Sequence, residues 1–130
     1  MKKSILVLTF SVMIMVNAAC QQSADNAVST ITVDSLKKVL ATEKVVVLDV
    51  RTPEEYAEGH IEGAVNIDFR NPDFSKNIDA IDKSKKYEVY CHSGKRSMAA
   101  VKIMNAKNLN ATNVEGGIVE WQGKGNPTVK

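Results

Sequence analysis

The sequence predicts one α/β domain built around a parallel β-sheet. The first reason is a continuous apolar run at residues 45–50 (VVVLDV), which is typical of a strand buried on both faces. The second is that strand-like runs alternate with short helical patterns along the chain. The third is the length of 130 residues, enough for one compact domain and too short for two ordinary ones.

The domain is expected to begin with a short strand or lead-in at residues 31–33, followed by a helix over residues 34–40. Thr32 or Asp34 is the expected N-cap of this helix, because both side chains accept hydrogen bonds from free backbone amides. The helical spacing places three apolar residues on one face: Leu36, Val39 and Leu40.

Residues 45–50 form the next predicted strand, and a helix start follows it at once. Thr52 suits the N-cap, Pro53 fits the first helical position and Glu55 completes a capping box. We expect this helix to be short and to end at Gly59.

The second half of the domain contains strands expected at residues 64–67 and 87–90, with a helical turn or two around residues 74–81 between them. The clearest helical pattern of the chain covers residues 95–107. Its apolar face is expected to contain Ser97, Ala100, Val101 and Met104, widened by Ile103.

A brief strand is expected at residues 113–114, and Gly116-Gly117 then turns into a short helix that carries Trp121. Trp121 is expected to be a core residue or the wall of a pocket. His60 is expected to be a partly buried histidine with its hydrogen bonds satisfied. We expect the domain to cover residues 31–125 and residues 126–130 to be a frayed tail.

The first residues have the parts of a secretory signal peptide. A basic start, Met1-Lys2-Lys3, precedes an apolar run at residues 5–16, which is too short to span a bilayer comfortably. Small residues follow it. We therefore exclude residues 1–19 from the fold and expect residues 20–30, which are small and polar, to be a flexible tether.

Ala18-Ala19-Cys20 resembles the lipobox of bacterial lipoproteins, although Asn17 stands where that family has an apolar residue. The resemblance implies lipidation of Cys20 and an exported protein anchored in the periplasm or cell envelope, since buried acyl chains give stable anchoring. The alternative is ordinary signal cleavage near Ala18 or Ala19, with no lipid anchor.

The charge balance does not favour a nucleic-acid partner, and none is predicted. The full chain has 17 basic and 15 acidic residues, and loss of Lys2 and Lys3 with the signal leaves 15 of each. Nucleic-acid binding requires a clustered basic face, which the sequence lacks. We expect a monomer at this size. The pair Cys91-His92 does not have metal-ligand spacing, and no metal or other cofactor is predicted.

The segment Tyr90-Cys91-His92-Ser93-Gly94-Lys95-Arg96-Ser97 places a thiol between a predicted strand and a predicted helix. The free backbone amides at the start of that helix can curl into an anion cradle, and Gly94 permits the turn. Lys95 and Arg96 add positive charge. These features favour the Cys91 thiolate and lower its pKa. The alternative is a buried, inert cysteine at the end of a strand.

Two chemistries use a thiolate in such a cradle. One handles phosphate or arsenate, and the other transfers sulfur through a cysteine persulfide. Four residues separate Cys91 from Arg96, one fewer than in cysteine phosphatases, and Tyr90 stands where those enzymes usually have His. The tighter loop favours sulfur, because a persulfide is smaller than a phosphoryl group.

Four motifs in order resemble the rhodanese family of sulfurtransferases, of the single-domain thiosulfate type. They lie in residues 48–56 (LDVRTPEEY), residues 59–67 (GHIEGAVNI), the loop at residues 91–97 (CHSGKRS) and Gly116-Gly117 with Trp121. The resemblance covers about residues 30–123. It implies a sheet of about five parallel strands with helices on both faces, and ping-pong transfer through Cys91.

The resemblance also implies roles for the loop residues. Cys91 accepts the sulfur, and the backbone amides from His92 to Ser97 hold the persulfide, with Ser93 and Gly94 inside that stretch. Lys95 and Arg96 attract a small anionic donor such as thiosulfate, and Ser97 caps the helix or donates a hydrogen bond. The acceptor is a thiol or cyanide. Asp49 and Arg51 are expected to form a salt bridge that supports the loop from below.

Two other functions stay open on the sequence alone. One is an arsenate- or phosphate-handling enzyme of the same fold. The other is a non-catalytic sulfur carrier or binding module, which the presence of Cys91 disfavours.

Overall fold

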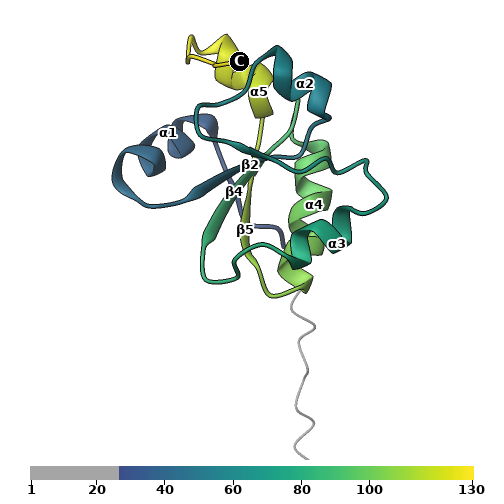
Figure 1. The fold of residues 1–130 in the computed structure, drawn as a ribbon. Helices are drawn as coiled ribbons and strands as arrows, with labels where there is room; N and C mark the ends of the chain where they lie inside the picture. Colours follow the sequence, from purple (N-terminus) through teal and green to yellow (C-terminus); the bar gives the residue numbers. More distant parts are fainter. Residues whose placement is uncertain (1–26) are drawn as a thin grey trace, which may run out of the picture.

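The computed structural model describes residues 27–130, which form a five-stranded parallel sheet with helices on both faces (Figure 1). The strand order is β1-β5-β4-β2-β3, and every pair is parallel. The expected α/β fold is therefore confirmed. The expected signal peptide, Cys20 and most of the expected tether lie outside the described residues.

The elements follow one another as alternating strands and helices. In chain order they are β1 (Thr30–Ile31), α1 (Val33–Thr42), β2 (Val46–Asp49), α2 (Pro53–Glu58), β3 (Val65–Asn66), α3 (Phe74–Asp79), β4 (Lys86–Tyr90), α4 (Lys95–Ala106), β5 (Asn110–Val114) and α5 (Gly117–Gly123). No helix within residues 27–130 combines the length and the apolar character needed to cross a membrane.

The sheet separates two hydrophobic cores. On one face α3 and α4 pack against the strands, with Ile78, Val89 and Met104 fully buried. On the other face α1 and α5 cover the sheet and enclose Leu36 and Trp121. Because both faces are covered, the central strands are apolar on both sides, as the run at residues 45–50 predicted.

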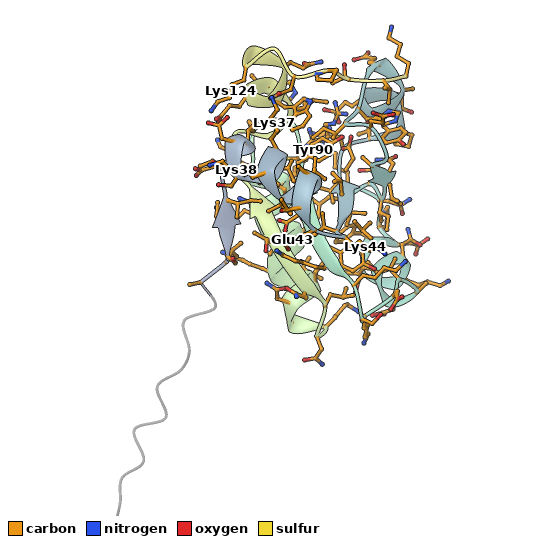
Figure 2. The ribbon with its side chains drawn as sticks, turned by 90° about the vertical axis from the view of Figure 1, so that its left-hand side faces the viewer. Lys37, Lys38, Glu43, Lys44, Tyr90 and Lys124 are labelled. Carbon is orange, nitrogen blue, oxygen red and sulfur yellow. The ribbon has the colours of Figure 1, made fainter. Side chains whose placement is uncertain are left out.

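Helix α1 begins as the sequence predicted, with Thr32 as its N-cap. The Thr32 hydroxyl accepts a hydrogen bond from the Ser35 amide at 3.1 Å. The apolar face differs from the prediction: Val33 and Leu36 are fully buried, whereas Leu40 is 36% exposed. Figure 2 looks onto this side of the molecule, where α1 lies in front of the sheet.

The ends of the domain extend further than predicted. Val28 packs against the core and the Ser29 carbonyl accepts from the Asn113 amide, so the domain begins before residue 31. Residues 126–130 are not a frayed tail, because Val129 and His60 exchange two backbone hydrogen bonds of 2.9 Å. The Trp121 indole also donates to the Pro127 carbonyl at 2.8 Å.

Strand β5 and one face residue of α4 also differ from the sequence prediction. Strand β5 has five residues rather than two, and its polar side chains Thr112 and Asn113 are buried. Helix α4 buries Ser97, Ala100, Val101 and Met104 as predicted. Ile103, which we expected to widen this face, is instead 36% exposed.

A leucine pair in α1 tests the packing of this helix. We predict that Leu36→Ala lowers the free energy of unfolding by about 2–5 kcal/mol, because it leaves a cavity under α1. Leu40→Ala is the matched control on the same helix and should cost less than about 1 kcal/mol, since Leu40 is 36% exposed. Urea denaturation of both variants measures the difference. Equal losses would contradict the observed orientation of α1.

Candidate functional site

The candidate site is the loop between β4 and α4, at the carboxyl end of the central strand. Reactive groups of open α/β sheets lie beyond the carboxyl ends of the strands. Cys91 follows directly on β4, and Gly94 is the N-cap of α4. Its φ of 104° lies in the region that favours glycine, so Gly94 allows the chain to reverse around the sulfur.

Hydrogen-bond donors converge on the Cys91 sulfur, which is buried. The Gly94 amide donates to Sγ at 3.1 Å, and the Ser97 hydroxyl lies 3.4 Å from the same atom. The Ser97 hydroxyl also lies 3.1 Å from the Gly94 carbonyl oxygen. A hydroxyl has one hydrogen to donate, so a thiolate competes with that carbonyl for it. Ser97 can thus donate to the sulfur, and α4 has no side-chain cap hydrogen bond.

The pKa of the Cys91 thiol is lowered by this arrangement. Burial acts in the opposite direction and raises the pKa, because it disfavours the charged form. Hydrogen bonds from the Ser97 hydroxyl and from the backbone amides of Ser97, Gly94 and Ser93 outweigh it. The loop thus stabilises an anionic sulfur in a place where water is largely excluded.

The outer side of the loop is held by the start of α5. The Ile118 amide donates to the Cys91 carbonyl at 3.0 Å, and the Val119 amide donates to the His92 carbonyl at 3.2 Å. Gly117 makes this approach possible: its φ is 55°, and a Cβ there would lie 2.5 Å from both carbonyl oxygens. The glycine pair of the last motif therefore permits close packing of α5 on the loop.

Asp49 and Arg51 form the salt bridge that the sequence predicted. The Arg51 guanidinium donates to Asp49 Oδ2 at 2.7 Å, and both side chains are buried. The Tyr90 hydroxyl donates to the same Oδ2 at 2.6 Å, which connects the pair to the residue before Cys91. Burial raises the pKa of Tyr90 and the Asp49 carboxylate raises it further, so this hydroxyl stays protonated.

Further residues of the second motif support the same network, and sequence reasoning did not single them out. The Asn66 side-chain amide donates to the backbone carbonyls of Asp49 at 3.0 Å and Arg51 at 2.9 Å. The Arg51 guanidinium donates to the Gly59 carbonyl at 2.8 Å. Both Gly59 and Asn66 belong to the motif GHIEGAVN. That motif does not indicate which groups these two residues contact.

Three residues of the loop have exposed side chains, whereas Arg96 is engaged in an ion pair. His92, Ser93 and Lys95 are exposed. The Arg96 guanidinium instead makes two 2.8 Å contacts with the Glu55 carboxylate of α2. Arg96 therefore has a carboxylate partner in this structure, a contact that the sequence did not predict. Glu55 was predicted only as part of the capping box, which is also present.

A pocket of about 280 Å³ opens beside the loop. Its lining comes from four parts of the chain: Arg51, Glu55, Glu58, Gly59, His92, Ile118 and Gln122. His60 lies outside it, buried and stacked on Tyr56 with a ring separation of 3.6 Å, as a satisfied histidine. Trp121 is a core residue. Residues 27–130 contain no cluster of three or more His, Cys, Asp or Glu side chains arranged for a metal.

Comparison with known proteins assigns the domain that contains this loop to a family. The family model for the rhodanese-like domain matches residues 32–124. The chain belongs to the rhodanese-like family. A putative sulfurtransferase of Bacillus subtilis, YtwF, is 40% identical over 91 residues, which cover 70% of this chain and 86% of that protein.

Two further relatives support the membership of the rhodanese-like family. The thiosulfate sulfurtransferase PspE of Escherichia coli is 31% identical over 71 residues, covering 55% of this chain and 68% of that protein. The crystal structure of a rhodanese-related protein from Thermoplasma volcanium superposes with a TM-score of 0.71 at 35% identity, covering 78% of this chain and 97% of that one. Both the loop and its scaffold thus belong to a rhodanese-like domain.

Two glycines of α5 test how the rhodanese-like loop is held. We predict that Gly117→Ala lowers the free energy of unfolding by about 2 kcal/mol or more, because an added Cβ strains the backbone and meets the loop carbonyls. Gly123→Ala, in the same helix, meets no atom within 4 Å and should be neutral or slightly stabilising. Denaturant titration compares the two. A harmless Gly117→Ala would contradict the close packing of α5.

A second prediction concerns the Cys91 pKa. Ser97→Ala should raise it, because the thiolate loses its hydroxyl donor while burial is unchanged. Ser93→Ala is the control: it retains the backbone amide, and the Ser93 side chain is exposed. The ultraviolet absorbance of the thiolate against pH gives the three midpoints. A midpoint that is the same in Ser97→Ala and wild type would exclude this role for the hydroxyl.

Proposed function

We propose that this protein is an exported sulfurtransferase that carries sulfane sulfur on Cys91. The donor is thiosulfate or a persulfide, and the acceptor is a thiol or cyanide. The observation that supports this most directly is the set of donors around the buried sulfur, with the Gly94 amide at 3.1 Å and the Ser97 hydroxyl at 3.4 Å. Membership of a family that contains sulfurtransferases supports the same chemistry.

The first half-reaction loads the cysteine. The Cys91 thiolate attacks the outer sulfur of the donor, a Cys91 S–S bond forms, and the donor's own S–S bond breaks. With thiosulfate, sulfite leaves with the bonding electron pair. With an alkyl persulfide R–S–SH, the thiolate R–S⁻ leaves and the proton passes to the new persulfide or to water.

The second half-reaction returns the sulfur to an acceptor. Cyanide or a thiolate attacks the terminal sulfur of the Cys91 persulfide, and the Cys91 thiolate leaves with the bonding electrons. The amides of the loop serve both steps, because they face an anionic sulfur before loading and after it. The enzyme alternates between the two forms, which predicts ping-pong kinetics.

Export and lipid anchoring through Cys20 form part of this proposal. Ala27 and Val28, the first described residues, line a small cavity with Lys102 and Asn105 in the second half of α4. Cys91 precedes the first residue of that helix, Lys95, and so lies at its other end. Figure 1 shows the course of α4. A tether attached there would join the domain far from the reactive loop, and the loop would stay open to donors and acceptors.

Replacement of the cysteine tests the proposed function. Incubation of the protein with thiosulfate or an alkyl persulfide should add the mass of one sulfur atom at Cys91, and cyanide should remove it as thiocyanate. Cys91→Ser should show neither event while its circular dichroism and unfolding curve stay close to wild type. Peptide mapping locates the added sulfur.

Two results would overturn the proposed function. Sulfur transfer retained in Cys91→Ser would exclude the Cys91 persulfide. A free and titratable Cys91 that gains no sulfur from either donor would exclude a sulfurtransferase, and turnover of arsenate or an aryl phosphate by the same sample would then indicate the other chemistry of this loop.

A further inference from the structure

The ion pair between Glu55 and Arg96 lies beside the reactive loop and occupies one of its two cationic side chains. The carboxylate and the guanidinium face each other through two parallel contacts of 2.8 Å, one from each terminal nitrogen. Bidentate pairs of this kind have well-defined geometry and are stronger than single contacts. Glu55 belongs to α2 and Arg96 to the first turn of α4, so the pair joins two elements 41 residues apart in the chain.

Glu55 is held as an anion at neutral pH by its contacts with Arg96 and Thr52. The Arg96 guanidinium lowers the Glu55 pKa to about 2, and the Thr52 amide adds to the effect despite partial burial of the carboxylate. The Thr52 amide donates to the same Oε2 atom at 3.0 Å. The capping box of α2 thus fixes the carboxylate in front of Arg96 before any substrate arrives.

Within residues 27–130, the lining of the 280 Å³ pocket contains no lysine or arginine without a carboxylate partner, whereas Lys95 of the loop is exposed outside that lining. Among the residues that line the 280 Å³ pocket, Arg51 is paired with Asp49 and Glu55 with Arg96. The remaining lining carboxylate belongs to Glu58, which is exposed. A dianion in this pocket therefore lies beside two carboxylates, and both nearby guanidinium groups already have carboxylate partners.

We propose that Glu55 determines donor specificity by keeping Arg96 occupied, so that the site disfavours thiosulfate and favours a sulfane sulfur carried on an organic thiol. Thiosulfate needs a cation for its sulfonate end, and Arg96 can supply one only when its contacts with Glu55 break. An alkyl persulfide presents the same terminal sulfur without that dianionic end. This inference rests on the proposed transfer through Cys91 and narrows its donor.

Glu55→Gln tests the proposal without removing the capping box. A glutamine side-chain oxygen still accepts from the Thr52 amide, whereas the charge that holds Arg96 is gone. Glu54→Gln is the matched control, since Glu54 is exposed, lies in the same helical turn and is absent from the ion pairs of residues 27–130. Both variants remove one negative charge from α2.

The readout is the rate of Cys91 sulfuration in a single turnover, followed by intact mass for two donors. The donors are thiosulfate and 2-hydroxyethyl persulfide, whose organic end carries no charge. Glu55→Gln should raise the rate constant for thiosulfate about tenfold, the effect of one charged hydrogen bond. It should change the rate for the persulfide less than about twofold, and Glu54→Gln should change neither by more than that.

Two further measurements separate an electrostatic role from a loosened loop. The gain with thiosulfate should shrink as ionic strength rises, because exposed charge interactions are screened. It should also be absent in the double variant Glu55→Gln/Arg96→Gln, since the gain needs the freed guanidinium. A structural effect of Glu55→Gln would affect both donors alike and would depend on neither salt nor Arg96.

The outcomes distinguish this inference from the proposed function. If both donors load Cys91 and Glu55→Gln leaves their ratio unchanged, the role of Glu55 is wrong while the sulfurtransferase stands. If Glu55→Gln favours the persulfide over thiosulfate, the sign of the effect is wrong. If neither donor loads wild-type Cys91, the proposed function fails first.

Discussion

The orientation of the peptide groups in the Cys91 loop is the constraint on which the rest of the site depends. A thiolate that is almost completely buried is unstable unless donors replace the water that it loses. Here the donors are mostly backbone amides, which have fixed positions once the loop is closed. The Val119 amide binds the His92 carbonyl, which shares its peptide group with the Ser93 donor amide, and the Ile118 amide binds the neighbouring Cys91 carbonyl. The first turn of α5 therefore helps to hold these peptide groups in their orientation.

The polar network below the loop serves a different purpose from the donors around the sulfur. Asp49, Arg51 and Tyr90 are buried in contact with one another at the ends of two adjacent strands. Their hydrogen bonds are satisfied by each other and by backbone groups, which is the condition for polar groups to be tolerated in a core. This network connects β2 to β4 through Tyr90, the residue that precedes Cys91. The position of Cys91 is therefore fixed by the sheet as well as by the loop.

Local features of the sequence allowed much of the fold and part of the site to be predicted. The capping box at Thr52, the buried face of α4 and the salt bridge between Asp49 and Arg51 depend on residues close in sequence. All three are present, apart from Ile103, which is exposed on α4. The length of β5 was missed because Thr112 and Asn113 are buried polar residues and break the apolar pattern.

The contacts that sequence reasoning could not find join distant segments. Val129 pairs with His60, and Arg96 pairs with Glu55, across 69 and 41 residues respectively. No periodicity connects such pairs, because they meet only once the whole chain has folded. For Arg96 the consequence is chemical: a residue predicted to attract an anionic donor is held by a carboxylate of its own chain.

The most direct test of the central claim is an NMR titration of the backbone amides of Ser93, Gly94 and Ser97, with Cys91→Ser as reference. We predict that all three amide protons move downfield as Cys91 ionises, with one shared midpoint below the pKa of a free thiol, and that the movement is absent in Cys91→Ser. Amides that do not respond, or a shared midpoint above that of a free thiol, would contradict a loop built to hold an anionic sulfur.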